Sequence, residues 1–413
     1  MFSAKLRQTA GCAALLVSLA ACSGRLEGGL IPVRETAPGA SQVDILAATT
    51  RRPSDAPGQL FAGERGDQLS FADITISIPP DANRRIGDVQ MASSEIGDPA
   101  RDFVALRAER LDEAQAVKRF HEKLIRTHKR QVLVFVHGFN TRFGEAVFRL
   151  AQIAHDSDLP AVPVLFTWPS RGDLFSYTYD RESANFSRDS LERLLQYLQR
   201  DPAVGEIDIL AHSMGNWVTL EALRQMAIRD KRLAPKIKSV MLAAPDVDID
   251  VFRRQIQQIG NDRPPFTLFV SRDDKALIVS RKVWGNVPRV GAIDPDAEPF
   301  KSQFAAERIN VIDLTDVTTD DSLNHSKFAE SPKVVEMIGR RLASGENFND
   351  KGGLGEKVVQ ATAGAASTVG SAAGLAISAP LAIVDPNTRE SLGSQFDNLG
   401  QNVRSTVGEV SHY

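Results

Sequence analysis

The sequence of 413 residues has few cysteines, little net charge and no long, strongly apolar segment. Its two cysteines, Cys12 and Cys22, do not supply a disulfide framework, because Cys12 lies within a predicted leader and Cys22 would then stand alone. The net charge of −3 gives no reason to expect a nucleic acid as partner. The apolar stretch 13–21 is shorter than the roughly 20 residues of a membrane-spanning helix. Phosphate-binding loops, dinucleotide-binding glycine motifs and internal repeats are also missing from the sequence.

The N-terminus has the pattern of a bacterial lipoprotein signal peptide. Two basic residues precede the apolar stretch, which ends in Leu-Ala-Ala-Cys (19–22). A small residue before the cleavage point and a Cys directly after it resemble a lipobox, so we expect residues 1–21 to be removed and Cys22 to be acylated. Simple secretion with cleavage before Cys22 is the alternative. Acyl chains would anchor the protein in the bacterial cell envelope, and Ser23, in place of Asp, favours the outer membrane.

Composition divides the rest of the chain into three segments. Residues 22–42 are rich in Gly, Pro and Ser and are expected to form a flexible tether. Residues 43–345 carry the apolar runs of a globular domain. Residues 346–413 form a low-complexity tail rich in Ala and Gly. Its uncharged stretch 358–384 is weakly apolar and Pro380 interrupts it, so a flexible or loosely helical surface segment is expected rather than a spanning helix.

Within the domain, continuous apolar runs alternate with helical patterns from residue 130 onward. Strands that are covered on both faces of a parallel sheet need apolar residues throughout, rather than at every second position. The sequence therefore predicts an α/β fold with an open, mostly parallel, doubly wound sheet and helices on both faces. The expected strands are 43–48, 74–78, 103–106, 132–136, 162–167, 207–211, 240–244, 266–270 and 309–314, and the expected helices are 109–124, 145–156, 182–200, 216–230 and 331–343.

Ser213 follows the apolar run 207–210 and precedes a helical pattern that begins at Asn216. The small residues Ala211 and Gly215 flank it two positions away on either side. This pattern is typical of the strand–Ser–helix turn known as the nucleophile elbow, whose strained backbone lifts the Ser side chain above the sheet edge and demands small neighbours. The helix N-terminus offers backbone N–H groups to a developing oxyanion. A Ser that merely caps a helix is the alternative.

A nucleophilic Ser needs a His to accept its proton. In α/β-hydrolases the acid and then the His follow the Ser along the chain. Only His325 and His412 do so here, and His412 lies in the low-complexity tail. His325 lies in a polar loop between the last predicted strand and the last predicted helix, which is where such a fold places its base. His137 precedes the Ser and is expected to hydrogen-bond its own loop.

The acid of a catalytic triad should follow a late strand. The strand 266–270 leads into Asp273 and Asp274, and either carboxylate could orient the imidazole and stabilise its protonated form. Asp246, after the strand 240–244, is a rival position. A carboxylate at a helix N-terminus is the preferred interpretation of Asp246.

Two backbone N–H groups are needed to bind an oxyanion. Met214, directly after the nucleophile, would supply one of them. The predicted strand 132–136 leads into His-Gly-Phe-Asn (137–140), where Gly138 allows the backbone to approach a substrate and Phe139 would supply the second N–H. These residues imply no metal and no cofactor.

Several motifs together resemble a bacterial α/β-hydrolase family of uncharacterised function, whose members are described as esterase- or lipase-like. The resemblance covers roughly 43–345 and implies that Ser213 is the nucleophile, His325 the base and Asp274, of the two neighbouring aspartates, the acid. It implies no physiological substrate. The motifs are Ala-Thr-Thr-Arg (48–51), Val-His-Gly-Phe-Asn (136–140), Thr-Trp-Pro-Ser-Arg-Gly (167–172), Ala-His-Ser-Met-Gly-Asn (211–216), Ala-Ala-Pro-Asp-Val-Asp (243–248) and Ser-Arg-Asp-Asp-Lys-Ala-Leu (271–277).

The combined prediction is a lipid-anchored serine hydrolase of that family, which cleaves a carboxylic ester through an acyl-enzyme. The same triad serves thioesterases, amidases and peptidases, and a non-catalytic envelope lipoprotein with this fold is the alternative from a different class. The expected partners are a small ester or acyl substrate and, through Cys22, the membrane; no nucleic acid is expected. Phe139, Trp168, Phe175 and Tyr177 are candidates either for the substrate pocket or for the core.

Overall fold

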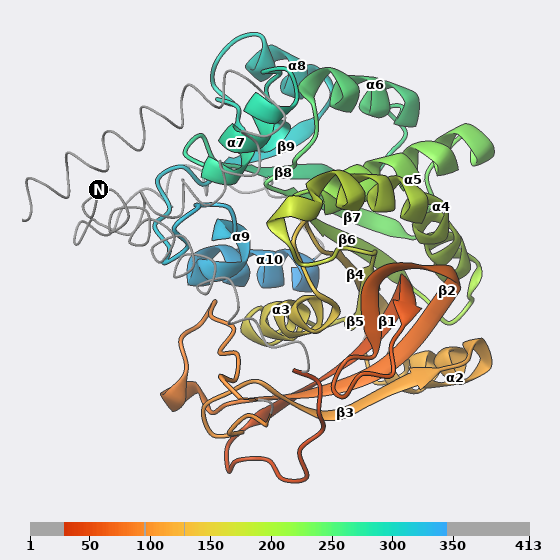
Figure 1. Cartoon of the computed structure of the whole chain (residues 1–413). Helices are drawn as coiled ribbons and strands as arrows, with labels where there is room; N and C mark the ends of the chain where they lie inside the picture. Colours follow the sequence, from red (N-terminus) through yellow and green to blue (C-terminus); the bar gives the residue numbers. More distant parts are fainter. Residues whose placement is uncertain (1–28, 95, 128, 345–413) are drawn as a thin grey trace, which may run out of the picture.

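The computed structural model of the chain describes residues 29–94, 96–127 and 129–344. These residues form one nine-stranded sheet with helices on both faces (Figure 1). The strands are β1 Ser41–Pro53, β2 Phe61–Ile78, β3 Val104–Leu111, β4 Gln131–Val136, β5 Val162–Thr167, β6 Glu206–His212, β7 Ile237–Ala243, β8 Phe266–Val270 and β9 Ile309–Asp313. The helices are α2 Glu113–Leu124, α3 Phe143–Asp156, α4 Tyr177–Arg200, α5 Gly215–Asp230, α6 Ile249–Ile259, α7 Lys275–Val283, α8 Phe300–Ala306, α9 Lys327–Glu330 and α10 Pro332–Ser344.

The sheet is parallel except at one edge, which confirms the predicted mostly parallel α/β fold. The strand order is β3-β2-β1-β5-β4-β6-β7-β8-β9. Only β1–β2 and β2–β3 are antiparallel among these pairs. The chain passes from β4 to β5 on one side and then crosses to β6 on the other side of β4. The loops after β4 and β6 therefore open next to each other at the carboxyl edge of the sheet, where open α/β sheets place their sites.

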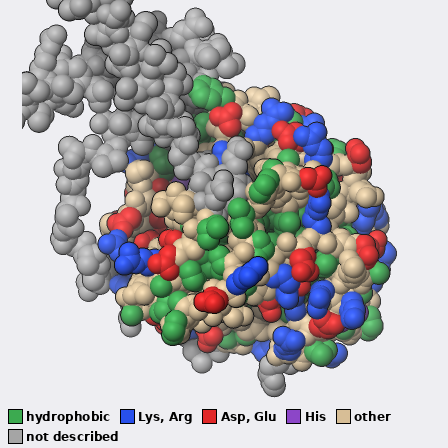
Figure 2. Space-filling view, turned by 60° about the horizontal axis from the view of Figure 1, so that its bottom comes forward, with side chains coloured by type: hydrophobic (Ala, Val, Ile, Leu, Met, Phe, Trp, Pro, Cys, Tyr) green, Lys and Arg blue, Asp and Glu red, His purple; other side chains and the backbone are tan. Residues whose placement is uncertain are grey.

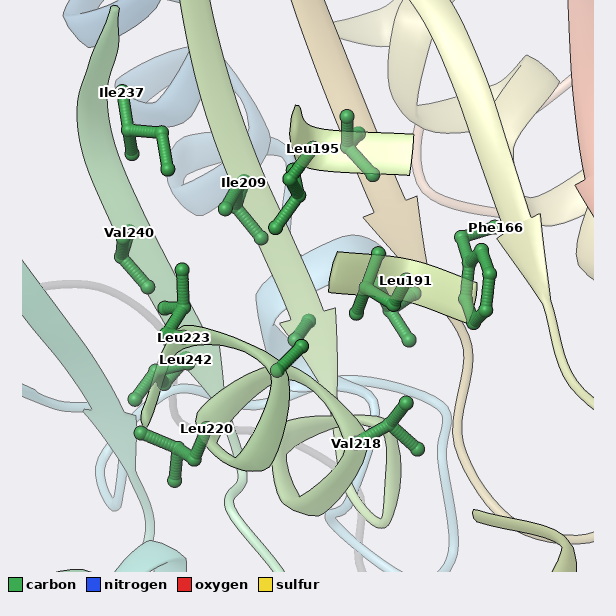
Figure 3. Packing of buried hydrophobic residues seen from close by; sticks show 14 of the residues in the cluster. Phe166, Leu191, Leu195, Ile209, Val218, Leu220, Leu223, Ile237, Val240 and Leu242 are labelled. Carbon is green, nitrogen blue, oxygen red and sulfur yellow. The ribbon is translucent and has the colours of Figure 1, made fainter. Parts of the chain in front are cut away.

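Two apolar layers cover the two faces of the sheet. In β4, Val132, Val134 and Val136 pack in the layer that contains α2, α4, α5 and α6, whereas Leu133 and Phe135 pack in the layer that contains α3 and α10. Figure 3 shows part of the first layer, where side chains of α4 and α5 lie against those of β5, β6 and β7. Because successive strand residues point to opposite faces and both faces are covered, the strands are apolar throughout.

The predicted helix 109–124 begins later than expected, because a capping box sets its start. The Asp112 side chain accepts a hydrogen bond from the backbone N–H of Gln115, and the Gln115 side chain accepts one from the N–H of Asp112. Residues 109–111 belong to β3 instead. Helices α6 to α9 lie outside the predicted set; the side chains of Asp248 and Asp274 cap α6 and α7.

The expected flexible tether over 22–42 is wrong in its second half. Leu30 is only 2% exposed and its N–H donates to the carbonyl of Gly58, while the N–H of Val33 donates to the carbonyl of Ala105 in β3. Strand β1 already begins at Ser41. Gly and Pro weaken regular structure, but one buried Leu and two backbone hydrogen bonds hold this segment against the sheet.

Other expectations concern parts of the chain outside the described residues. These are the signal peptide 1–21, the acylated Cys22 and the tail 346–413. Among the helices that the structure describes, none is both long and apolar enough to cross a membrane. On the face shown in Figure 2, acidic and basic side chains are interspersed around a middle region where hydrophobic side chains gather.

Candidate active site

Ser213 occupies a tight turn between β6 and α5. Its φ of +53° lies in the left-handed region, which is rare for a residue with a side chain. The turn is held because the N–H of Ser213 donates to the carbonyl of Ala243 (3.0 Å) and the Asn216 side chain donates to the carbonyl of Ser213 (2.9 Å). A Cβ at Gly215 would collide with the carbonyl oxygens at the end of β4. The small residue at this position is therefore a steric requirement of the turn.

His325 and Asp274 meet beside this turn. The Nδ1 atom of His325 lies 2.7 Å from Oδ2 of Asp274, and the other carboxylate oxygen accepts the N–H of Leu277 (2.9 Å) at the start of α7. Since Nδ1–H is used by Asp274, the proton acceptor of the ring is Nε2, which has no hydrogen-bond partner among the described residues. Ser213 and His325 line the same cavity.

The pKa values of the two histidines at the site are shifted in opposite directions. Burial lowers the pKa of His325, but the charge and the hydrogen bond of Asp274 more than offset it, so that this pKa lies above its ordinary value. Burial, with His325 next, holds the pKa of His212 well below its ordinary value. The neutral His212 ring donates through Nε2 to the carbonyl of His325 (3.2 Å). His325 can thus take up a proton, while His212 supports its loop.

Asp273, the neighbouring candidate, has different partners. Its carboxylate accepts two hydrogen bonds from Nζ of Lys327 (2.8 and 3.0 Å) and one from the Asn324 side chain (2.9 Å). These bonds join the loop that carries His325 to the loop that carries Asp274. The structure therefore gives the two adjacent aspartates separate positions, one on the imidazole and one between the loops.

Asp246 is buried beside the same cavity. Its carboxylate accepts hydrogen bonds from the Tyr177 hydroxyl (2.7 Å) and the Ser280 hydroxyl (2.6 Å), and Nε of Arg289 lies 3.5 Å away. The expectation that Asp246 sits at a helix N-terminus is wrong, because Asp248 is the residue that caps α6. Long-range partners rather than a local cap hold this carboxylate.

The loop after β4 brings its backbone close to Ser213. A Cβ at Gly138 would lie 2.8 Å from the Cβ of Ser213, so only glycine allows this approach. Nδ1 of His137 lies 2.8 Å from the carbonyl oxygen of Gly138, and that oxygen can only accept. In a trans peptide the C=O and the following N–H point in opposite directions, so the N–H of Phe139 points away from His137. Within the described part of the chain, neither this amide nor that of Met214 has an acceptor.

A cavity of about 510 Å³ opens over these groups. Ser213 and His325 lie in its wall, together with apolar side chains such as Leu277 and Val283 of α7. Helix α3 contributes the charged residues Glu145 and Arg149 to the wall. The cavity therefore combines apolar surface with a charged region.

Of the four aromatic candidates, two line the pocket, one lies in the core and one is exposed. Phe139 and Tyr177 line the cavity and contact each other edge to face at 4.8 Å. Trp168 is fully buried and stacks on His137 at 5.0 Å. Phe175 is 68% exposed and is not part of the cavity wall.

More than half of the chain, residues 112–341, matches the family described as "Alpha/beta hydrolase of unknown function (DUF900)". The chain belongs to this family. Membership and the observed sheet confirm the predicted family and the α/β-hydrolase fold. The match begins at Asp112, so the strands β1, β2 and β3 of this α/β hydrolase lie outside it.

Individual relatives are distant. "Uncharacterized protein alr1448" of Nostoc sp. is 25% identical over 132 residues, which are 26% of this chain and 34% of that protein. The chain thus spans about a third of the length of the curated relative it matches.

Three solved structures are similar to parts of this chain. A lin2722 gene product of Listeria innocua is 9% identical, with 52% of this chain and 95% of that chain covered and a TM-score of 0.32. A lipase-esterase related protein of Clostridium acetobutylicum is 14% identical, with 51% and 93% covered and a TM-score of 0.27. The Pyrococcus furiosus esterase Pf2001 is 10% identical, with 76% and 98% covered and a TM-score of 0.32.

Polar residues that sequence reasoning missed shape the loop of this α/β hydrolase that carries His325. The Asp321 carboxylate accepts the backbone N–H groups of His325 (2.6 Å) and Ser326 (2.8 Å). The ring of His212 lies 4.7 Å from the rings of both His325 and Phe328. A local signal exists for Asp321, since an Asp at the start of a polar loop commonly caps nearby N–H groups. In the described residues, no group of three or more His, Cys, Asp or Glu side chains is placed to hold a metal ion.

Proposed function

We propose that the protein is a serine hydrolase that cleaves carboxylic esters through an acyl-enzyme. Ser213 attacks the carbonyl carbon, and Nε2 of His325 accepts the hydroxyl proton and later delivers it to the leaving oxygen. Asp274 holds the imidazole in the required tautomer and stabilises its protonated form. The N–H groups of Phe139 and Met214 bind the oxyanion, and water then releases the acyl group.

One observation carries this proposal: Ser213, His325 and Phe139 line a single cavity. Ser213 lies on a left-handed turn, His325 is paired with Asp274 at 2.7 Å, and the backbone amides of Phe139 and of Met214, next to Ser213, have no acceptor among the described residues. Membership of an α/β-hydrolase family supports hydrolysis in general. A cavity of about 510 Å³ suits a small molecule better than a polypeptide chain, which favours an ester over a protein substrate.

A fluorophosphonate probe tests the nucleophile. The probe should label the wild-type protein, while Ser213→Ala should retain the wild-type circular dichroism spectrum and remain unlabelled. Equal labelling of both proteins would show that another residue is the nucleophile.

A substrate panel then tests the ester assignment. Esters, thioesters and amides with the same acyl group should be compared under one condition, and the esters should give the highest kcat/KM. A higher value for the thioester or the amide would move the protein to that class. A protein that is neither labelled nor active on any member would be the non-catalytic envelope protein.

A further inference from the structure

The loop that carries the Phe139 amide is held by a buried arginine of β1. Arg51 is 1% exposed, and its guanidinium donates to the carbonyl of Thr141 (2.7 Å), the carbonyl of Ser170 (2.8 Å) and the hydroxyl of Thr167 (2.8 Å). A fourth bond reaches the carbonyl of Ala62 (3.2 Å). The planar, five-donor guanidinium can serve acceptors in several directions at once, whereas a lysine offers a single point charge.

A buried carboxylate holds the same loop from the other side. Asp180 of α4 is fully buried, and it accepts hydrogen bonds from the Ser170 hydroxyl, the N–H of Arg171 (3.1 Å) and the N–H of Asn140 (3.4 Å). The Ser170 hydroxyl oxygen in turn accepts the N–H of Thr141 (3.0 Å). The backbone directly after the Phe139 amide is therefore held at its N–H groups by Asp180 and Ser170 and at a carbonyl by Arg51.

Arg51 also contacts the histidine that orients the oxyanion amide. Nε2 of His137 lies 3.4 Å from Nη2 of Arg51 and 2.9 Å from the hydroxyl of Thr167, and it accepts the N–H of Trp168 (3.2 Å). Burial, followed by the charge of Arg51, lowers the pKa of His137 to about 3, so the ring is neutral near pH 7. A neutral ring whose Nε2 accepts must carry its proton on Nδ1, and that proton is the one donated to Gly138.

We propose that Arg51 is a positioning residue of the oxyanion hole. Through its contacts with the Thr141 carbonyl and His137, Arg51 holds the Gly138–Phe139 peptide in place. The N–H of Phe139 therefore already points, before substrate binds, at the position where the oxyanion will form. Donors that are fixed in advance stabilise a transition state without the cost of reorganisation. The inference rests on the hydrolase function proposed above. It makes β1, which lies outside the family match, a part of the catalytic centre.

The test compares Arg51→Lys with Arg263→Lys. Arg263 is a suitable control because its side chain is only 5% exposed and it also donates to backbone carbonyls, those of Gly260 and Glu307, but it precedes β8 at the amino edge of the sheet. Each variant is measured for kcat and KM on one ester, for inhibition by a trifluoromethyl ketone that forms an oxyanion at the Ser, and for melting temperature.

Arg51→Lys should lower kcat by tenfold to a hundredfold, because loss of a whole oxyanion donor costs on the order of 10²- to 10³-fold and here the donor is only misplaced. KM should change less than threefold, and the ketone should bind more weakly by the same factor as kcat falls. Arg263→Lys should lower the melting temperature but leave kcat and ketone affinity unchanged. If Arg51→Lys loses only melting temperature, the role of Arg51 is purely structural and the proposal is overturned, while the hydrolase function stands.

Ser170→Ala serves as a second variant if Arg51→Lys does not fold. It removes the bond to the N–H of Thr141 and leaves the guanidinium in place. A matched fall in kcat and in ketone affinity supports the positioning role, and wild-type values for both overturn it. Absence of fluorophosphonate labelling and of ester turnover in the wild type would overturn the proposed function together with this inference.

Discussion

Replacing Asp274 by Asn should remove general-base catalysis while keeping the shape of the site. Both carboxylate oxygens are acceptors, one for the N–H of Leu277 and the other for Nδ1–H of His325. Asparagine has only one acceptor oxygen. If that oxygen keeps the bond to the N–H of Leu277, the amide NH₂ of the new Asn faces Nδ1 of His325. Because the NH₂ group can only donate, Nδ1 must then accept its hydrogen bond and carries no proton. The ring proton moves to Nε2, the nitrogen that accepts the proton of Ser213 in the proposed mechanism.

The size of the effect follows from this change of tautomer. In a serine protease triad the equivalent substitution lowers kcat about 10⁴-fold, which corresponds to about 5 kcal/mol of barrier. If the Asn side chain instead turns its oxygen to His325, α7 loses its cap, which costs only about 1 kcal/mol of stability. That second arrangement would keep the tautomer, so it would cost stability rather than kcat. With the oxygen on Leu277, which keeps the cap, we expect kcat to fall by about four orders of magnitude with a small change in melting temperature.

The assay is kcat and KM on one ester for Asp274→Asn, Asp273→Asn and Asp246→Asn. Asp273→Asn weakens the bonds to Lys327 and Asn324, so it should affect melting temperature more than kcat. Asp246→Asn should have a smaller effect on kcat than Asp274→Asn. If Asp246→Asn causes the largest loss of kcat, the acid follows β7 and Asp274 does not orient the base.

Three further predictions concern pH, packing and the anchor. The kcat/KM of the wild type should rise with pH, because His325 must be neutral to accept a proton. Asp274 raises the pKa of His325 from its ordinary value of 6.5, so the midpoint of this rise should lie above pH 6.5. A midpoint below pH 6.5 would contradict this. Gly215→Ala should destabilise the fold by more than about 2 kcal/mol in urea unfolding, because its Cβ would collide with the carbonyl oxygens of Val136 and His137. An unchanged unfolding midpoint would show that the turn can shift. The mature protein should begin at Cys22 and carry added acyl mass; intact mass without that addition would exclude the lipid anchor.

Local patterns were sufficient to predict the framework of the fold. Parallel strands that are covered on both faces have to be apolar throughout, so their runs are visible one at a time; the predicted strand 266–270 coincides with β8. The turn at Ser213 depends on small residues two positions away, which are also visible locally. The same local reasoning failed for residues 29–42, because burial of Leu30 depends on packing against distant segments.

Tertiary structure alone decided how the polar groups of the site are paired. The residue pattern left Asp273 and Asp274 as equal candidates and only the family resemblance favoured Asp274; in the structure, the direction in which the loop sends each side chain distinguishes them. Their partners, Lys327 and His325, lie more than 50 residues further along the chain. Arg51 is separated from Thr167 by 116 residues, yet they hydrogen-bond because β1 pairs with β5. Hydrogen bonds depend on distance and direction in space, whereas a sequence pattern records only spacing along the chain.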